Sequence, residues 1–177
     1  MIRPLYIFDL DGTLADIEHR RRYVRWPHED CSDCGGKNSR NCVMCADLDG
    51  DFKPDWPGFF KACVEDVPMK NVIRLMHSLI DDGNDVWIWS GRSDEVKTET
   101  EEWLHSWTFF YSQIPAVLKM RQQGDHQPDD KLKYGWYMTM NQHDKDRLVM
   151  TFDDRDRMVE MWRKRGLTCL QVAPGDF

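Results

Sequence analysis

The chain has 177 residues, of which 41% are hydrophobic and 31% charged, and this composition is typical of a globular protein and too apolar for a disordered one. The formal net charge of -7 argues against a general nucleic-acid coat, which needs a broad basic surface. No apolar run reaches membrane-spanning length and the N-terminus has no signal-peptide pattern, so we expect a cytoplasmic protein without a membrane partner.

Short apolar stretches alternate with helical patterns along the chain. Strands are predicted at residues 5–8, 86–89, 115–120, 147–152 and 167–172. Amphipathic spacing predicts helices at about 69–80, 96–107 and 155–165, and a weaker pattern, interrupted by Gly135, predicts one at 129–141. Parallel strands need crossover connections that cover both sheet faces. We therefore expect an α/β fold, with a doubly wound, Rossmann-like parallel sheet of about five strands in a single domain, residues 1–177.

Residues 16–68 break this alternation and are interpreted as an inserted cap. The segment contains two CxxC pairs within residues 31–45, formed by Cys31, Cys34, Cys42 and Cys45. Thiolates suit zinc, and each pair can wrap the metal from one tight turn, so we predict a zinc ribbon or knuckle. A closed tetrahedral site has no open position, which makes this Zn²⁺ structural; a redox pair or an iron site is the alternative.

A local basic cluster also lies near the start of this insertion. It comprises Arg20, Arg21, Arg22, Arg25, Lys37 and Arg40. Such a cluster can bind nucleic acid or can simply be a solvated helix face, and the sequence leaves both interpretations open.

The string FDLDGTLAD at residues 8–16 carries the clearest chemical signal, because it directly follows an apolar strand. A turn at Gly12 allows Asp9 and Asp11 to converge, and Thr13 can donate a hydrogen bond to a phosphate. Two carboxylates and a phosphate repel one another, so a hard cation such as Mg²⁺ is expected there. An EF-hand calcium loop fits poorly, because its glycine stands sixth rather than fourth and a helix precedes it.

Four motifs follow the first four predicted strands in order. They are DLDGT at 9–13, WSGR at 89–92, a lysine after the third strand, and FDDR at 152–155. In this order they resemble the motifs of the haloacid dehalogenase superfamily of phosphatases. The strings QGDHQPDDKLK at 123–133 and DDRDRMVEMWRKRGLTCLQVAPGDF at 153–177 resemble, more closely, the phosphatase domain of the phage polynucleotide kinase/3′-phosphatase family.

This resemblance implies a role for each matching position. Asp9 would be the nucleophile, Asp11 the general acid and base, and Lys133 the residue that neutralises phosphoryl charge; the nearby Lys131 is its competitor. Mg²⁺ would be held by Asp9, the main-chain carbonyl of Asp11, Asp153 and Asp154, although one of the paired aspartates could instead cap the last helix. The residues implied for phosphate binding are Thr13, Arg20, Ser90, Gly91 and Arg92, with Asp129 orienting Lys133.

The substrate is less well defined than the chemistry. The chain has no GxxxxGK[ST] loop of the kind that a kinase half would need, so we expect a phosphatase alone. The family removes 3′-phosphates from nucleic-acid ends, and this is the leading prediction. A phosphatase of free nucleotides would share every catalytic residue, and a non-catalytic zinc-ribbon module that binds nucleic acid is a third alternative.

Overall fold

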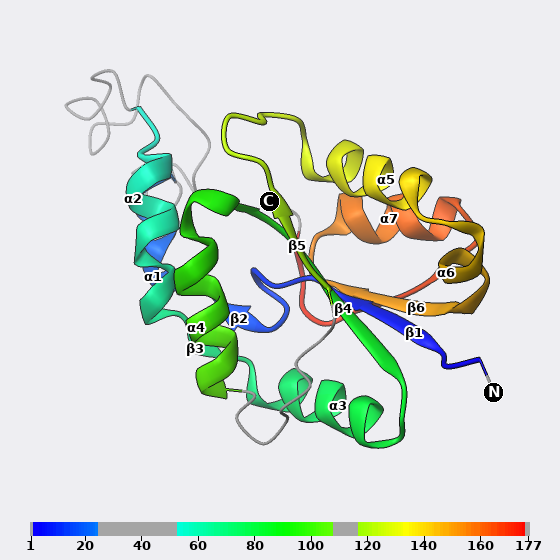
Figure 1. Cartoon of the computed structure of the whole chain (residues 1–177). Helices are drawn as coiled ribbons and strands as arrows, with labels where there is room; N and C mark the ends of the chain where they lie inside the picture. The colour runs from blue at the N-terminus through cyan, green and yellow to red at the C-terminus, as the bar shows by residue number, and fades with distance from the viewer. Residues whose placement is uncertain (1, 25–52, 108–116, 176–177) are drawn as a thin grey trace.

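The computed structural model describes residues 2–24, 53–107 and 117–175, and its centre is a parallel β-sheet (Figure 1). The five strands stand in the order β5-β4-β1-β6-β7. Their bounds are β1 Leu5–Phe8, β4 Asp85–Ser93, β5 Val117–Arg121, β6 Leu148–Asp153 and β7 Thr168–Gln171. The sheet order places β1 in the middle, paired in parallel with β4 on one side and β6 on the other. The expected α/β class and parallel sheet are thus confirmed.

Helices cover both faces of the sheet (Figure 1). They are α3 Lys70–Asp81 and α4 Lys97–Trp107 on one face, and α5 Asp129–Thr139 and α7 Asp156–Lys164 on the other, with a short α6 Gln142–Arg147. Successive side chains of β1 point to opposite faces of the sheet, which explains this arrangement. Phe8 packs into the core with α3 and α4, whereas Leu5 and Ile7 pack with α7. The two cores together fix the position of the strand ends.

The structure extends or adds to several of the predicted elements. Strand β4 continues to Ser93, so the WSGR motif lies within the strand rather than after it. Helix α5 forms despite Gly135. The short helix α6 was missed, because none of its residues is buried and it therefore has no apolar period to detect. Its start is marked by Asn141, whose side chain accepts a hydrogen bond from the amide of Asp144 at 2.8 Å.

The two ends of the 16–68 segment meet in a small antiparallel ribbon. Strand β2 Ala15–Asp16 pairs with β3 Val67–Pro68, and helices α1 Glu18–Arg21 and α2 Trp56–Lys61 lie between them in the chain. The 3₁₀ turns at Ala62–Glu65 and Asp94–Val96 precede β3 and α4. The zinc-site prediction at Cys31, Cys34, Cys42 and Cys45 falls outside the described residues.

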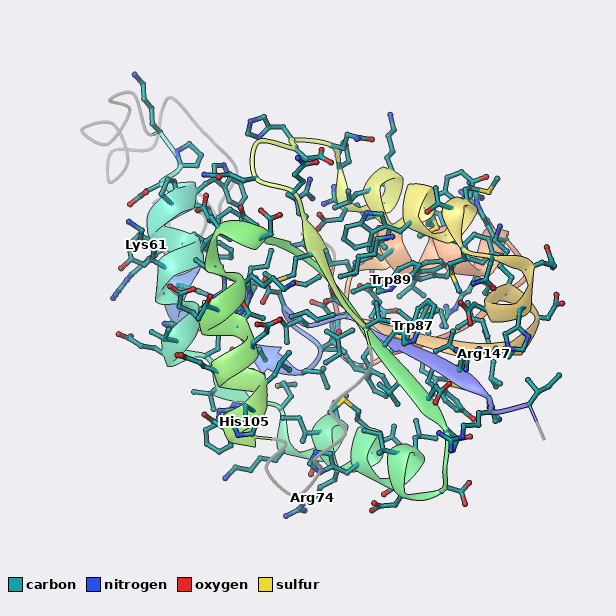
Figure 2. All side chains as sticks on the ribbon, viewed as in Figure 1. Lys61, Arg74, Trp87, Trp89, His105 and Arg147 are labelled. Carbon is teal, nitrogen blue, oxygen red and sulfur yellow. The ribbon has the colours of Figure 1, made fainter. Side chains whose placement is uncertain are left out.

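Side chains sort by face as the fold requires (Figure 2). The labelled Lys61, Arg74 and His105 are exposed on the outer sides of α2, α3 and α4. Trp89 is buried between β4 and the helices α5 and α7, where its ring meets those of Trp136 and Trp162. None of the helices in the described ranges is long and apolar enough to cross a membrane.

Candidate active site

The carboxyl ends of β1 and β6 bring three aspartates together. The amide of Asp9 donates to the carbonyl of Phe152 at 2.9 Å, so the pairing of the two strands continues to the nucleophile candidate. The Phe8 and Phe152 rings stack behind it at 4.1 Å. One carboxylate oxygen from each of Asp9, Asp153 and Asp154 lies within 4.8 Å of the others, and all three residues are buried. Residues 144 positions apart in the chain therefore form one acidic cluster.

Lys133 supplies a positive charge to this cluster from α5. Its ammonium donates to Asp9 Oδ1 at 2.5 Å and to Asp153 Oδ2 at 3.0 Å, and the residue is 3% exposed. Burial lowers the pKa of Lys133, but the carboxylates of Asp153 and Asp9 outweigh that effect and raise it above its ordinary value. The lysine thus stays charged. Lys131, the competing candidate, is exposed.

One ammonium does not balance three buried carboxylates. Burial, with the neighbouring Asp153 and Asp154, raises the pKa of Asp9 well above its usual range although Lys133 opposes the shift. Burial and Asp153 raise the pKa of Asp154 to about 6. Asp154 Oδ1 is also buried without a hydrogen-bond partner among the described residues. A cluster of carboxylate oxygens with surplus negative charge fits a hard divalent cation such as Mg²⁺.

Gly12 permits the close approach of the first motif to this cluster. Its φ is +89°, a left-handed conformation, and a Cβ built there would lie 2.1 Å from Asp154 Oδ2. Neither of the paired aspartates accepts a capping bond inside α7, whose N-cap residue is Arg155 and has no side-chain cap. The capping alternative for Asp154 is therefore not what the structure shows.

Asp11 faces a different set of partners from Asp9. Its Oδ1 accepts hydrogen bonds from Arg20 Nη2 at 2.7 Å and from Arg92 Nη2. Burial raises the pKa of Asp11, but the two guanidiniums more than offset it and hold the pKa well below its usual range. The side chain of Asp11 is not in the acidic cluster, so its part in holding Mg²⁺ rests on the predicted contact of its main-chain carbonyl.

Asp66 is a buried member of this arginine group that sequence reasoning missed. It accepts from Arg20 Nε at 2.7 Å, from Arg92 Nη2 at 2.7 Å and from His19 Nε2 at 2.9 Å. Nothing in the sequence separates Asp66 from its exposed neighbour Glu65, because the turn before β3 has no periodic pattern. Asp66 can be identified only in the folded structure, where the two ends of the insertion meet.

The remaining phosphate-binding candidates lie around the same strand ends. Ser90 is buried, and its Oγ accepts from the amide of Arg92 at 3.1 Å. A Cβ on Gly91 would meet Asp129 Oδ1 at 2.6 Å, so this glycine allows β4 to approach α5. Thr13 Oγ1 and Arg92 Nε are buried without partners among the described residues, which leaves both able to donate to a bound oxyanion.

Asp129 makes contacts that differ from those expected. It was predicted to orient Lys133, yet its carboxylate binds Arg121 Nη2 and, at 2.5 Å, Arg155 Nη1. The hydrogen bonds of Lys133 go to Asp9 and Asp153, while the charge of Asp129 is near enough to help raise the pKa of Lys133. The reason is geometric: Asp129 stands in the first turn of α5, where it faces the loop after β5 and the start of α7. Arg121 and Arg155 were not singled out from the sequence.

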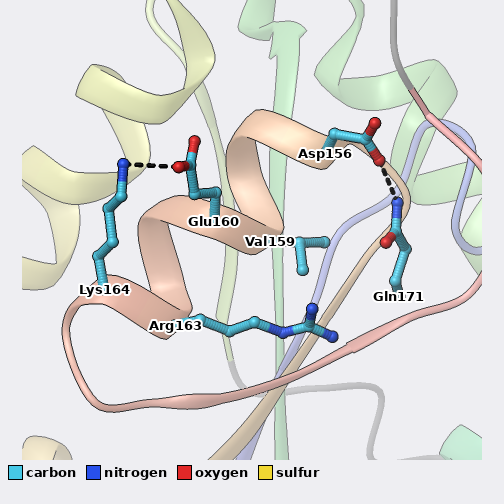
Figure 3. Close-up of a pocket in the computed structure, with 6 residues that line it drawn as sticks. All are labelled: Asp156, Val159, Glu160, Arg163, Lys164 and Gln171. Carbon is cyan, nitrogen blue, oxygen red and sulfur yellow. Dashed lines mark hydrogen bonds and ion pairs between the residues drawn. The ribbon is translucent and has the colours of Figure 1, made fainter.

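A surface hollow between α7 and β7 lies apart from this constellation (Figure 3). Its charged side chains are already paired, with Lys164 Nζ at 2.6 Å from Glu160 and Gln171 Nε2 donating to Asp156 at 2.6 Å. Asp9, Asp11 and Lys133 do not line it. The chemistry of the protein is therefore assigned to the strand ends.

Solved structures of other proteins share this fold. A chain in the structure of the Pnkp1/Rnl/Hen1 RNA repair complex is 22% identical, with a TM-score of 0.67 over 99% of this chain and 44% of that one. A second structure of the Pnkp1/Rnl/Hen1 complex gives 23% identity and a TM-score of 0.69 over 99% and 48%. A putative phosphatase from Clostridium difficile gives 14% and 0.56 over 97% and 85%. The chain spans less than half the length of the first two, and identities this low show the fold alone.

The family follows from sequence. A family model described as the polynucleotide kinase PNKP phosphatase domain, of the HAD type, matches residues 40–177. That range includes Arg92, Lys133 and the Asp153–Asp154 pair. Asp9 and Asp11 precede it in the chain, and the fold brings Asp9 beside the aspartate pair and Asp11 beside Arg92. Since the match covers most of the chain, the protein belongs to the HAD-type family of polynucleotide kinase PNKP phosphatase domains.

Proposed function

We propose that the chain is a Mg²⁺-dependent phosphomonoesterase that removes 3′-phosphates from nucleic-acid ends through an aspartyl-phosphate intermediate. The observation that carries this proposal is the buried cluster of Asp9, Asp153 and Asp154, with Lys133 Nζ 2.5 Å from Asp9 Oδ1. A carboxylate nucleophile needs a phosphate beside it and positive charge around both. The cluster supports that arrangement with Lys133 on one side and surplus acceptors for a cation on the other.

The first chemical step uses Asp9 and Asp11. A carboxylate oxygen of Asp9 attacks phosphorus, the bond from phosphorus to the ester oxygen breaks, and Asp11 gives its proton to the departing oxygen. In the second step Asp11 takes a proton from water, which attacks phosphorus and releases inorganic phosphate from Asp9. Without substrate, Arg92 and Arg20 hold the pKa of Asp11 well below its usual range, which keeps the carboxylate charged but makes it a weak base. A phosphate dianion that shares the guanidiniums of Arg20 and Arg92 would raise that pKa toward the acid form.

Positive charge around the phosphoryl oxygens completes the site. Lys133 would offset charge on the oxygen nearest Asp9, and Arg92, Arg20, Ser90, Gly91 and Thr13 would bind the others. When held by Asp9, Asp153, Asp154 and the Asp11 carbonyl, Mg²⁺ supplies further positive charge beside the nucleophile. Asp129 would keep its partners Arg121 and Arg155 in place beside the site.

The substrate class rests on family membership and on residues 123–133 and 153–177, which resemble a polynucleotide 3′-phosphatase. A free nucleotide is the second candidate, and the net charge of -7 favours it because a polyanion is repelled by an acidic protein. Phosphate release from a 3′-phosphorylated oligonucleotide and from 3′-mononucleotides should be compared at equal concentration. We expect kcat/KM to be at least about tenfold higher for the oligonucleotide, a difference that one added backbone contact can supply.

The enzymatic character is tested separately with Asp9→Asn. We expect turnover to fall by about 10⁴-fold or more, because the amide cannot form the intermediate. Trapping of phosphate on the wild-type chain by acid quench, and its absence in the variant, would identify the covalent step. Near-native rates in a folded Asp9→Asn protein would contradict the mechanism, whereas a folded wild type without turnover would favour the non-catalytic module.

A further inference from the structure

Asp66 comes from the end of the 16–68 segment, and its carboxylate lies between the guanidiniums of Arg20 and Arg92. Its side chain is fully buried, and both oxygens are used. Oδ1 accepts from Arg20 Nε at 2.7 Å, while Oδ2 accepts from Arg20 Nη2 at 2.9 Å and from Arg92 Nη2 at 2.7 Å. The contact to Arg20 is thus the two-point pairing that orients a guanidinium plane.

The same arginine nitrogens also reach Asp11. Nη2 of Arg20 and Nη2 of Arg92 each donate to Asp66 Oδ2 and to Asp11 Oδ1. The two carboxylates therefore share the two guanidiniums, and four buried charges sum to zero. Asp66 and both arginines have side chains without exposure, whereas Asp11 is 13% exposed. The arginine pair is held from within by Asp66 and faces outward toward Asp11.

The carboxylate of Asp66 is itself fixed by its backbone. Its carbonyl accepts a hydrogen bond from Trp103 Nε1 of α4 at 2.8 Å, and its amide donates to the main-chain carbonyl of Cys63 at 3.2 Å. Arg20 is held further by stacking on the Phe59 ring at 4.3 Å, and Arg92 by Thr100 Oγ1 at 3.1 Å. Each guanidinium thus has a restraint of its own, and Asp66 is the group that both share.

We propose that Asp66 is a positioning residue, which fixes Arg20 and Arg92 so that a phosphate takes over the hydrogen bonds that Asp11 accepts from them and also accepts from the unpaired Arg92 Nε. The inference rests on the proposed function and adds a residue from the returning end of the insertion to it. The arginine from the start of that segment and the aspartate from its end pair with each other, and the arginine also contacts Asp11. The phosphate site is then complete only when both ends of the insertion are folded against the core.

The test uses Asp66→Asn in the full-length chain with Mg²⁺ present. We expect the dissociation constant of inorganic phosphate, measured by calorimetry, and KM for a phosphate monoester each to rise about tenfold or more, because misplaced guanidiniums lose paired contacts. The Mg²⁺ concentration for half-maximal binding should change by less than about twofold, since Asp66 does not touch the acidic cluster. Equal phosphate affinity in folded Asp66→Asn and wild type would overturn the proposal.

Coupling to the arginine separates positioning from a general structural role. In an Arg20→Gln background, Asp66→Asn should weaken phosphate binding by less than about threefold, because only Arg92 is left for Asp66 to position. An undiminished effect would mean that Asp66 acts elsewhere and would overturn the proposal. Asp55→Asn is the matched control: Asp55 also lies in the insertion, where it caps α2 through the Gly58 amide at 2.9 Å, and its loss should lower Tm without changing phosphate affinity.

The double variant also protects the test against misfolding. Removal of the Asp66 charge alone leaves Arg20 and Arg92 with only the Asp11 carboxylate as a counter-charge. Arg20→Gln with Asp66→Asn leaves one guanidinium and one carboxylate, which restores the charge balance. If Asp66→Asn does not fold, the double variant should fold and bind phosphate less than about threefold more weakly than Arg20→Gln; a larger loss would overturn the proposal. Phosphate binding that depends on Asp66 in a chain without turnover would contradict only the proposed function. Absence of phosphate binding to the wild type would contradict both.

Discussion

At the scale of single residues, Lys133 decides how the acidic cluster behaves without a metal. It is the cation that contacts both Asp9 and Asp153 from the helix side. Removing one partner from a buried ion pair is costlier than removing both, because the other charges stay desolvated. Lys133 is therefore expected to support folding as well as phosphate chemistry, and Mg²⁺ can replace the first of these roles but not the second.

We predict that Lys133→Met lowers kcat by about 10²–10³-fold and lowers the free energy of unfolding by about 3–5 kcal/mol in Mg²⁺-free buffer. Added Mg²⁺ should raise Tm more in the variant than in the wild type, because it neutralises carboxylates that have lost their ammonium. Thermal unfolding with and without Mg²⁺ measures this. Lys131→Met, two residues away and exposed, should leave kcat and Tm unchanged; equal loss in both variants would contradict the assignment.

Gly12 provides the second prediction at this scale. We expect Gly12→Ala to lower activity by about 10²-fold or more, since the new Cβ would displace the carboxylate of Asp154 from its place 2.1 Å away. Gly83→Ala is a control with a similar backbone, because Gly83 has φ +83° but no atom within 4 Å of a built Cβ. Gly83→Ala should cost about 1 kcal/mol of stability and leave kcat intact. Circular dichroism and steady-state rates distinguish the two effects.

At the scale of elements, the loop between β5 and α5 determines where Lys133 stands. Arg121 at the end of β5 donates to the carbonyls of Gly91 at 2.8 Å and of Gln127 at 2.7 Å. It also pairs with Asp129 in the first turn of α5. One guanidinium thus ties β4, the loop and α5 together. The helix that presents Lys133 is anchored at its N-terminal end by this residue.

We predict that Arg121→Lys lowers kcat by about tenfold and increases amide hydrogen exchange in residues 122–128. A lysine has a compact charge and cannot make the planar set of contacts that the guanidinium makes. Hydrogen exchange followed by mass spectrometry gives the local readout. Arg157→Lys is the matched control, because Arg157 is half exposed and lies 4.0 Å from the same Asp129 carboxylate. If both variants exchange alike, the anchoring role of Arg121 is wrong.

At the scale of the whole molecule, the described ends of the insertion pack into the core through Ile17 and Phe59. The antiparallel pairs Ala15 with Pro68 and Asp16 with Val67 join the two ends of residues 16–68 beside the sheet. We propose that this segment serves as a substrate-selecting cap, and that Cys31, Cys34, Cys42 and Cys45 bind a structural zinc ion within it.

The zinc proposal predicts one zinc per chain in protein purified without chelator. Cys34→Ser should lower zinc content and affinity for oligonucleotide, because thiolates are the ligands that hold such a site. Inductively coupled plasma mass spectrometry measures the metal. Cys169→Ser is the control, because Cys169 is buried in the core at β7 and should not alter zinc content. Protein without zinc would contradict the proposal and leave the core chemistry untouched.

The sequence by itself determined the class of fold and the acidic motifs. The spacing of apolar residues predicted all five strands of the parallel sheet and the helices α3, α4, α5 and α7, since each pattern is local and repeats within a few residues. The same locality placed Asp9 and Asp11 after β1 and the Asp153–Asp154 pair at the end of β6. It did not predict α6, which buries nothing.

Only the tertiary structure decided which charges share a neighbour. Asp66 and Arg155 bond to partners 26 to 47 residues away, and Arg121 donates to a carbonyl 30 residues away, so no local pattern distinguishes them from solvated residues. It also assigned Asp129 to arginines rather than to Lys133. Charges interact through space over a few ångströms, whereas sequence patterns report only which side of an element a residue occupies. The acidic motifs could therefore be predicted from the sequence. The partners of Arg20 and Arg92, and the roles of Arg121 and Arg155, could not.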